Sequence, residues 1–213
     1  MKSVALVVAA AFAAATVFVL TLASVRAEDA PATDKPTYVG NKVCQKCHFK
    51  EHGSWKKGAM AGAMKSLLPT TEADNKDLFK KKTDAKLDPA KDYTTDAKCL
   101  KCHTTGYGEA GGYPVDPAKD EDAKKAAALM GSVSCESCHG PGSNYVKYKE
   151  PIVQKDVEEK KETKFKWEDL AKYGLAKPDE AVCAKCHNKD APTQPAEAFK
   201  FDDAKAKVHP VKK

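Results

Sequence analysis

The stretch Cys44-Gln-Lys-Cys47-His48 sets a pattern in which two cysteines, three positions apart, are followed at once by a histidine. The chain of 213 residues contains four such motifs, and together they use all eight of its cysteines. On a short helix, residues i, i+3 and i+4 share one face, so each motif can present two thiols and an imidazole to one bound group. The other three motifs are Cys99-Leu-Lys-Cys102-His103, Cys135-Glu-Ser-Cys138-His139 and Cys183-Ala-Lys-Cys186-His187.

This motif is typical of covalent haem attachment, in which two thiols bond to the porphyrin and the histidine binds iron. Paired disulfides, thioredoxin-like dithiols and structural zinc are the other uses of closely spaced cysteines. None of them explains a histidine at the fifth position of every motif. The sequence therefore predicts four covalently bound haem c groups, with iron ligands His48, His103, His139 and His187.

The histidine count limits the second axial ligand of each iron. Six histidines are present, and four belong to the motifs, so only His52 and His209 remain for four distal positions. At most two haems can therefore be bis-histidine within one chain. The other irons must take methionine, an unusual ligand, a ligand from another chain, or none. Because axial ligands shift haem potentials over about 0.8 V, we expect either a ladder of potentials or a reactive open site.

Three residues are candidates for distal ligation. His209 stands in a lysine-rich tail with no evident core role, and Met60 is the next candidate. Met60 and Met64 are four residues apart, which also suits a buried helix face. His52 lies four residues after His48 and cannot reach the far side of the same iron, so a surface or propionate-bonded role is the alternative for it.

The first 27 residues predict export. Lys2 is followed by an apolar run over residues 4–22, and Val25 and Ala27 fit the small-residue rule for signal-peptide cleavage. An apolar run of this length could instead remain as a membrane anchor, which would be the one route to membrane contact. We expect cleavage, a flexible leader over residues 28–37 and a tetrahaem cytochrome domain over residues 38–213 in the periplasm or outside the cell.

The charge balance argues against a nucleic-acid partner. Past residue 27 the chain holds 34 lysines, no arginine and 30 acidic residues, a net charge of +4. Four haems with two propionates each would add about four negative charges, leaving the loaded protein near neutral. Phosphate binding depends on unspent positive charge, so we expect no nucleic-acid binding.

The fold class follows from the spacing and the helix signals. Steps of 55, 36 and 48 residues between the first cysteines of successive motifs argue against a solenoid of equal repeats. Helix signals precede Gly131 and Gly174, with Met130 as a packing residue, and strand-like alternation is nearly absent. Too few large apolar residues are present to fill a core of this size. We therefore expect a mainly α, loop-rich multihaem cytochrome c whose helices wrap around four haems, with helix starts at Asn41, Thr95-Asp96 and Pro178-Asp179-Glu180.

Several stretches of the chain resemble the tetrahaem cytochrome c-554 family of ammonia-oxidising bacteria. The likeness covers most of residues 38–190. It rests on Ala85-Lys-Leu-Asp-Pro-Ala-Lys-Asp-Tyr93, Cys99 to Gly108 with Gly111-Gly112-Tyr113, Cys135-Glu-Ser-Cys-His-Gly-Pro-Gly142, Tyr38-Val-Gly and Ser54-Trp55-Lys56. The resemblance implies closely packed haem pairs, three bis-histidine haems, a five-coordinate second haem on Cys99, Cys102 and His103, and electrons received from hydroxylamine oxidoreductase.

The chain departs from that pattern at two distal positions. Met60 stands where relatives place a histidine after the tryptophan. After His-Gly-Pro-Gly, where relatives place another histidine, this chain has only Tyr145, Lys147, Tyr148 and Lys149. His209 matches the last distal ligand of the family in a loose register. These differences agree with the independent count of histidines.

The sequence is compatible with three functions. The first is an electron shuttle between redox proteins, with an oxidoreductase as donor and a cytochrome or membrane quinone-linked protein as acceptor. The second is an enzyme that reduces a small nitrogen species such as nitric oxide at an open haem. The third is a subunit of an extracellular cytochrome filament, which six histidines for four haems disfavour. We expect the shuttle, and an electron-transfer role more than an enzymatic one.

Overall fold

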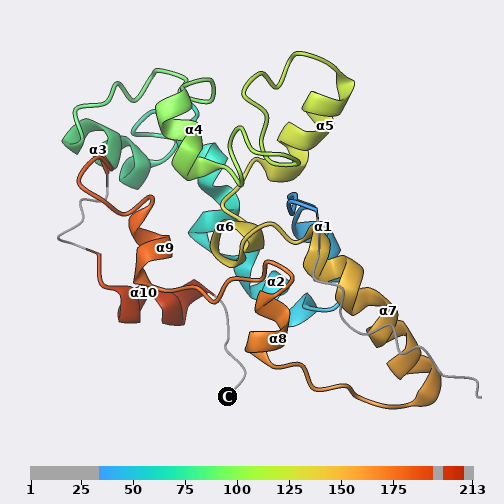
Figure 1. Cartoon of the computed structure of the whole chain (residues 1–213). Helices are drawn as coiled ribbons and strands as arrows, with labels where there is room; N and C mark the ends of the chain where they lie inside the picture. The colour runs from blue at the N-terminus through green and yellow to red at the C-terminus, as the bar shows by residue number, and fades with distance from the viewer. Residues whose placement is uncertain (1–33, 194–198, 209–213) are drawn as a thin grey trace, which may run out of the picture. The chain divides into compact units, whose positions relative to one another are not determined.

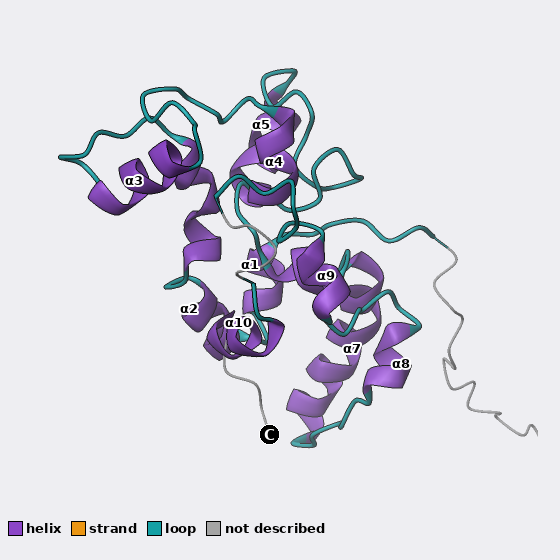
Figure 2. Ribbon diagram, turned by 90° about the vertical axis from the view of Figure 1, so that its left-hand side faces the viewer, coloured by secondary structure: helices purple, strands orange, loops and turns teal. Residues whose placement is uncertain are grey.

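Helices and loops make up the described part of the chain, residues 34–193 and 199–208, in this computed structural model (Figure 2). No strand occurs among these residues. The expected mainly α, loop-rich fold is therefore confirmed. The predicted signal segment and His209 lie outside the described residues. Within the described ranges, no helix combines the length and the apolar character that crossing a bilayer would require.

Most of the helices are short, and they follow one another along the chain with long loops between them (Figure 1). They are α1 (Asn41–Gln45), α2 (Phe49–Trp55), the 3-10 helix η1 (Ala59–Leu67), α3 (Lys76–Asp84), α4 (Ala97–His103), α5 (Glu121–Met130), α6 (Cys135–His139), α7 (Ser143–Glu159), α8 (Trp167–Ala171), α9 (Glu180–Ala184) and α10 (Phe201–Val208).

Aspartate side chains begin three of these helices. Asp96 accepts a hydrogen bond from the backbone N–H of Lys98, and Asp120 accepts one from Ala123. Asp179 caps α9 in the same way. Each carboxylate satisfies an N–H that has no partner inside its helix. The predicted starts at Asp96 and Asp179 are confirmed, and so is the helix that precedes Gly131.

Helix α1 begins at Asn41, as predicted, but the side chain of Asn41 does not cap it. Gly40, with φ at 87°, occupies the cap position of α1, and no side chain caps this helix. The Asn41 side-chain oxygen instead lies 3.2 Å from Nε2 of His52. A backbone at positive φ favours glycine, which explains why the chain turns into α1 at Gly40.

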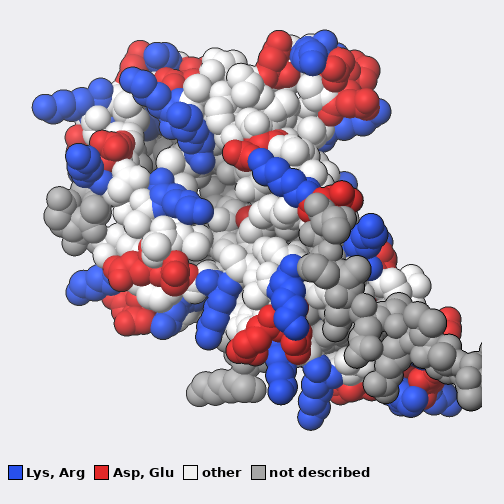
Figure 3. All heavy atoms as spheres, in the orientation of Figure 1, with Lys and Arg blue, Asp and Glu red and all other residues white. Residues whose placement is uncertain are grey.

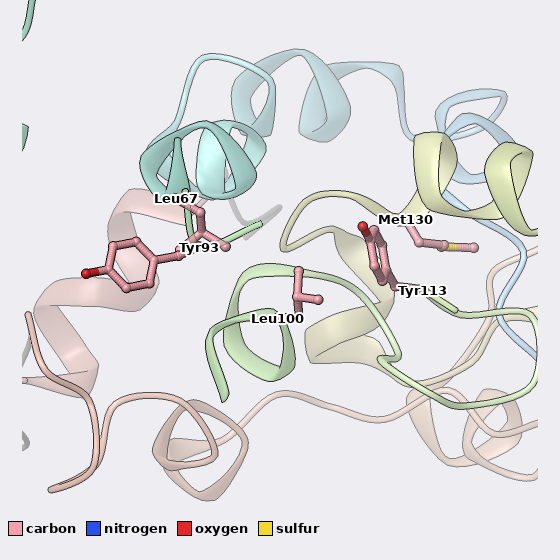
Figure 4. Close-up of a cluster of buried hydrophobic side chains, with 5 residues drawn as sticks. All are labelled: Leu67, Tyr93, Leu100, Tyr113 and Met130. Carbon is pink, nitrogen blue, oxygen red and sulfur yellow. The ribbon is translucent and has the colours of Figure 1, made fainter. Parts of the chain in front are cut away.

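A cluster of five buried side chains packs η1 and α4 against the end of α5 (Figure 4). Its members are Leu67, Tyr93, Leu100, Tyr113 and Met130. Met130 is only 1% exposed, which confirms its predicted packing role. This cluster fixes the second motif, which forms α4, next to η1.

Residues 34–40 run along the third motif and the start of α7. Glu136, which is only 3% exposed, accepts hydrogen bonds from the backbone N–H groups of Val39, Gly40 and Gly142. The Ser143 hydroxyl accepts a further bond from the N–H of Thr37. One buried carboxylate therefore joins the segment that leads into the first motif to the third motif.

Helix α7 continues through Pro151, although proline lacks the N–H that a helix interior needs. Tyr148 of this helix stacks on Tyr173 with ring centroids 3.9 Å apart and lies edge-on to Phe165. These aromatic contacts fasten α7 to the segment around α8, which offsets the cost of the internal proline.

Candidate haem sites

Each motif forms a helical turn that brings its two cysteines and its histidine together. The second motif lies in α4, and the third is α6. In the first and fourth motifs the histidine N–H bonds to the carbonyl of the first cysteine, at 2.9 Å for His48 to Cys44 and 2.9 Å for His187 to Cys183. The expected i, i+3, i+4 arrangement is present at all four sites.

Backbone carbonyls set the tautomer of two motif histidines. Nδ1 of His103 lies 2.8 Å from the Ala63 carbonyl oxygen, and Nδ1 of His139 lies 3.1 Å from that of Ala176. A carbonyl oxygen only accepts, so Nδ1 must carry the proton and Nε2 keeps its lone pair. Metal-binding histidines are oriented in this way. Both residues therefore fit the role of an iron ligand through Nε2.

The His187 ring is held in the neutral form that binds metals because it is partly buried. Burial lowers the pKa of this histidine, which keeps the ring neutral, and a neutral imidazole is the form that binds metals. The ring stacks on Phe199, with centroids 4.3 Å apart. Within the described residues its buried Nδ1 has no hydrogen-bond partner, so the structure does not set its tautomer as it does for His103 and His139.

The motifs meet in a definite order. The thiol of Cys44 hydrogen-bonds to that of Cys135, which raises the pKa of Cys44 and lowers the pKa of Cys135. The hydrogen bond from Cys186 lowers the pKa of Cys102 to about 7.

Cys138 completes the series, since it lies close enough to Cys183 and Cys186 to interact with both. Burial raises the pKa of the Cys138 thiol to about 11. No disulfide joins any of the eight cysteines, all of which lie within the described residues. The sites are neighbours in the order first, third, fourth, second.

The predicted distal ligands are placed differently from one another. His52 is buried, at 8% exposed, and packs on Trp55, so the alternative that made it a surface histidine is wrong. Met60 lies at the start of η1, and its carbonyl accepts from the N–H of Val133 at 3.1 Å, just before the third motif. His209 lies outside the described residues. No contact in the structure assigns His52 or Met60 to an iron.

Two residues that the sequence left as solvated or unassigned lie at the first site. The Tyr145 hydroxyl oxygen is 3.3 Å from Nε2 of His48, and the Lys149 ammonium donates to that oxygen at 2.9 Å. The four-residue spacing of Tyr145 and Lys149 was the signal available in the sequence, because residues i and i+4 share a helix face. That signal gained meaning only once α7 was known to be a helix.

Comparisons of sequence and of structure with known proteins lead to the same family. The family model described as "Cytochrome c554 and c-prime" matches residues 43–140. Cytochrome c-554 of Nitrosomonas europaea is 38% identical over 182 residues, which are 85% of this chain and 68% of that protein. The solved structure of reduced cytochrome c554 from the same organism superposes with a TM-score of 0.66 at 35% identity, covering 83% of this chain and 85% of that one.

The chain belongs to the cytochrome c-554 family. It is therefore a c-type cytochrome of the electron-transfer class with a multihaem fold, as the resemblance in sequence implied. Four covalent c-type haems are the cofactors of this family, and eight cysteines in four motifs agree with that number.

Proposed function

We propose that this cytochrome c-554 relative is an exported electron carrier that passes electrons through its four haems between redox proteins outside the cytoplasm. The observation that carries the proposal is the unbroken series of neighbouring motifs, first to third to fourth to second. A carrier needs its redox centres close enough for electrons to pass, and thiols in contact bring their haems together. The predicted signal segment supports the location.

We propose that the cysteines and the histidine of each motif hold one haem. Each haem is attached through the two cysteines of one motif, and the motif histidine binds its iron. Met60 and His209 are proposed distal ligands, and His52 is a weaker candidate because Asn41 already engages its Nε2. The attachment sites are Cys44 and Cys47, Cys99 and Cys102, Cys135 and Cys138, and Cys183 and Cys186.

The polypeptide orients the iron ligands and shields the sites. The haems supply one-electron exchange at iron when bound. The Ala63 carbonyl holds the His103 ring, and the Ala176 carbonyl holds the His139 ring, while the Ala176 N–H donates to the backbone carbonyl of His139 at 2.7 Å. Rigid ligands reduce the reorganisation that accompanies each change of charge, which suits a carrier.

The surface suits docking with other redox proteins. Lysine and acidic side chains mix around the edges of one face, while uncharged side chains occupy its middle (Figure 3). Such a mixed surface does not favour one sign of partner. We propose an oxidoreductase as electron donor and a cytochrome or a membrane quinone-linked protein as acceptor.

The mature protein is expected to be 186 residues long and to carry four haems. The intact mass of the purified protein should exceed that of the polypeptide from residue 28 by about four haem masses, because each motif holds one haem covalently. Redox titration should then resolve four one-electron steps. A mass that shows disulfides, zinc or fewer haems would contradict the proposal.

At least one haem is expected to be open to added ligands. Too few histidines remain for four distal positions, and the second site, at His103, is the first choice by family resemblance. Adding cyanide or nitric oxide to the oxidised protein should change the spectrum of one haem at once. Electron paramagnetic resonance should show a high-spin signal that disappears on binding. Purely low-spin signals that neither ligand alters would rule out the open site.

A further inference from the structure

A cavity opens between α1 and α7, and the first motif forms one of its walls. On the side of the motif it is lined by Cys44, Cys47 and His48 among others, and on the side of α7 by Tyr145 and Lys149. The two thiols and the imidazole that would hold the first haem therefore face a tyrosine and a lysine. No histidine of α7 is available for this position, since this helix contains none.

Tyr145 stands directly across from the iron-binding atom of the motif histidine. Its hydroxyl oxygen lies 3.3 Å from Nε2 of His48. Nε2 is the nitrogen left with a lone pair at the His103 and His139 sites, so the same atom of His48 is the ligand expected here. Metal bonds to nitrogen and oxygen of about 2 Å each would place two opposing ligands about 4 Å apart. The pair needs to separate by less than an ångström to admit a metal between them.

Lys149 holds the tyrosine oxygen in place from the other side. Its ammonium donates a hydrogen bond of 2.9 Å to that oxygen and lies 5.2 Å from the centre of the Phe165 ring. A positive charge at this point offsets the negative charge that a phenolate oxygen carries. At the rim of the cavity, Lys46 and Glu150 form an ion pair at 3.1 Å that joins the motif to α7.

We propose that Tyr145 is the sixth ligand of the iron held by His48, as a phenolate stabilised by Lys149. The proposal rests on the proposed function, in that the first motif must carry a haem. Coordination forms an iron–oxygen bond, the phenol proton passes to solvent, and no electron changes hands. Tyrosine is an established axial ligand of haem iron. An anionic oxygen ligand favours ferric iron, so this haem is the lowest in potential of the four.

The neighbouring residues of α7 do not compete for this position. Lys147 is exposed, and Tyr148 does not line the cavity but stacks on Tyr173, with ring centroids 3.9 Å apart. Tyr148 is thus a matched control: it is a second tyrosine on the same helix, three residues on, with a structural contact in place of a metal.

The test compares Tyr145→Phe and Tyr148→Phe in the purified holoprotein. Resonance Raman spectra of the oxidised parent should contain phenolate–iron modes, which Tyr145→Phe removes and Tyr148→Phe keeps. Cyanide titration should show one more cyanide bound per chain in Tyr145→Phe than in the parent. One midpoint potential should rise in this variant while the other three stay fixed. Lys149→Met should keep the phenolate modes and shift their frequency.

Tyr145→His provides an independent check, because it should convert the same haem to a low-spin bis-histidine centre without added cyanide binding. Phenolate modes that are absent from the parent, or cyanide binding and potentials that are unchanged in Tyr145→Phe, would overturn the proposal. Intact mass separates this outcome from failure of the proposed function. Four haems per chain with no effect at Tyr145 refute only the ligand, whereas fewer than four refute the carrier itself.

Discussion

Replacing Met60 with histidine is expected to lower the midpoint potential of one haem by about 0.1 V or more, out of the span of about 0.8 V that axial ligands cover. Thioether sulfur is a weaker donor than imidazole and favours ferrous iron, so a histidine–methionine haem has the higher potential of the two. The other three potentials should stay nearly fixed. Redox titration followed by absorption spectroscopy measures all four, and any sulfur-to-iron charge-transfer band should disappear.

We propose that the third site is the one that Met60 would serve. The Met60 carbonyl accepts a hydrogen bond from Val133, two residues before Cys135, so the start of η1 is tied to the approach of the third motif. The His139 ring of that motif is oriented by Ala176. If Met60 completes this iron, the third haem is the most oxidising low-spin centre. Electrons would then collect there, next to both the first and the fourth sites.

Met64 supplies the control for this substitution. It lies four residues after Met60 in η1 and packs against the buried cluster of Leu67, Tyr93, Leu100, Tyr113 and Met130. Met64→Ala should cost about 2 to 5 kcal/mol of stability and leave every potential unchanged. Met60→Ala should create a haem that binds cyanide. If Met60→His leaves all four potentials where they were and Met60→Ala behaves like Met64→Ala, Met60 is a packing residue.

The haem sites were predictable from sequence because their geometry is local. A cysteine, a second cysteine three residues later and a histidine next to it need only one helical turn to meet, and all four motifs form such a turn. Asp96 and Asp179 could be identified as helix starts for the same reason, since a cap bonds within three residues. Helix α1 does begin at Asn41, but Asn41 does not cap it because Gly40 occupies the cap position.

The order of the sites could not be predicted because it depends on contacts far apart in the chain. Cys44 meets Cys135 and Cys102 meets Cys186, and no local pattern encodes either pair. The pairing of Tyr145 with Lys149 could not be predicted for a related reason. Pro151 argues against a helix over residues 143–159, and the aromatic contacts of Tyr148 that outweigh it come from residues 165 and 173. Without that helix, Tyr145 and Lys149 have no common face.

Glu136→Gln is expected to destabilise the folded protein by about 3 kcal/mol, although the change only replaces one oxygen with an amide nitrogen. Both carboxylate oxygens accept backbone hydrogen bonds, at 2.9 Å from Val39, 2.7 Å from Gly40 and 2.7 Å from Gly142. A glutamine would turn an NH₂ group toward at least one of these N–H donors. A buried donor facing a donor loses its bond and keeps the cost of desolvation.

Glu121→Gln is the matched control for that experiment, because Glu121 is 76% exposed in its ion pair with Lys124 and such pairs contribute less than about 1 kcal/mol. For a protein of this size, the loss of about 3 kcal/mol in Glu136→Gln corresponds to a fall in Tm of roughly 6 to 12 °C. The control should melt within a few degrees of the parent. Both variants should carry four haems, since neither residue is an attachment site.

Glu136 joins the segment before the first motif to the third motif. Replacing this carboxylate should therefore also loosen the contact between these two sites. Hydrogen exchange should measure this as faster exchange of the Val39 and Gly40 amide hydrogens. Equal melting of the two variants would show that the bonds of this carboxylate add no more stability than a surface charge does.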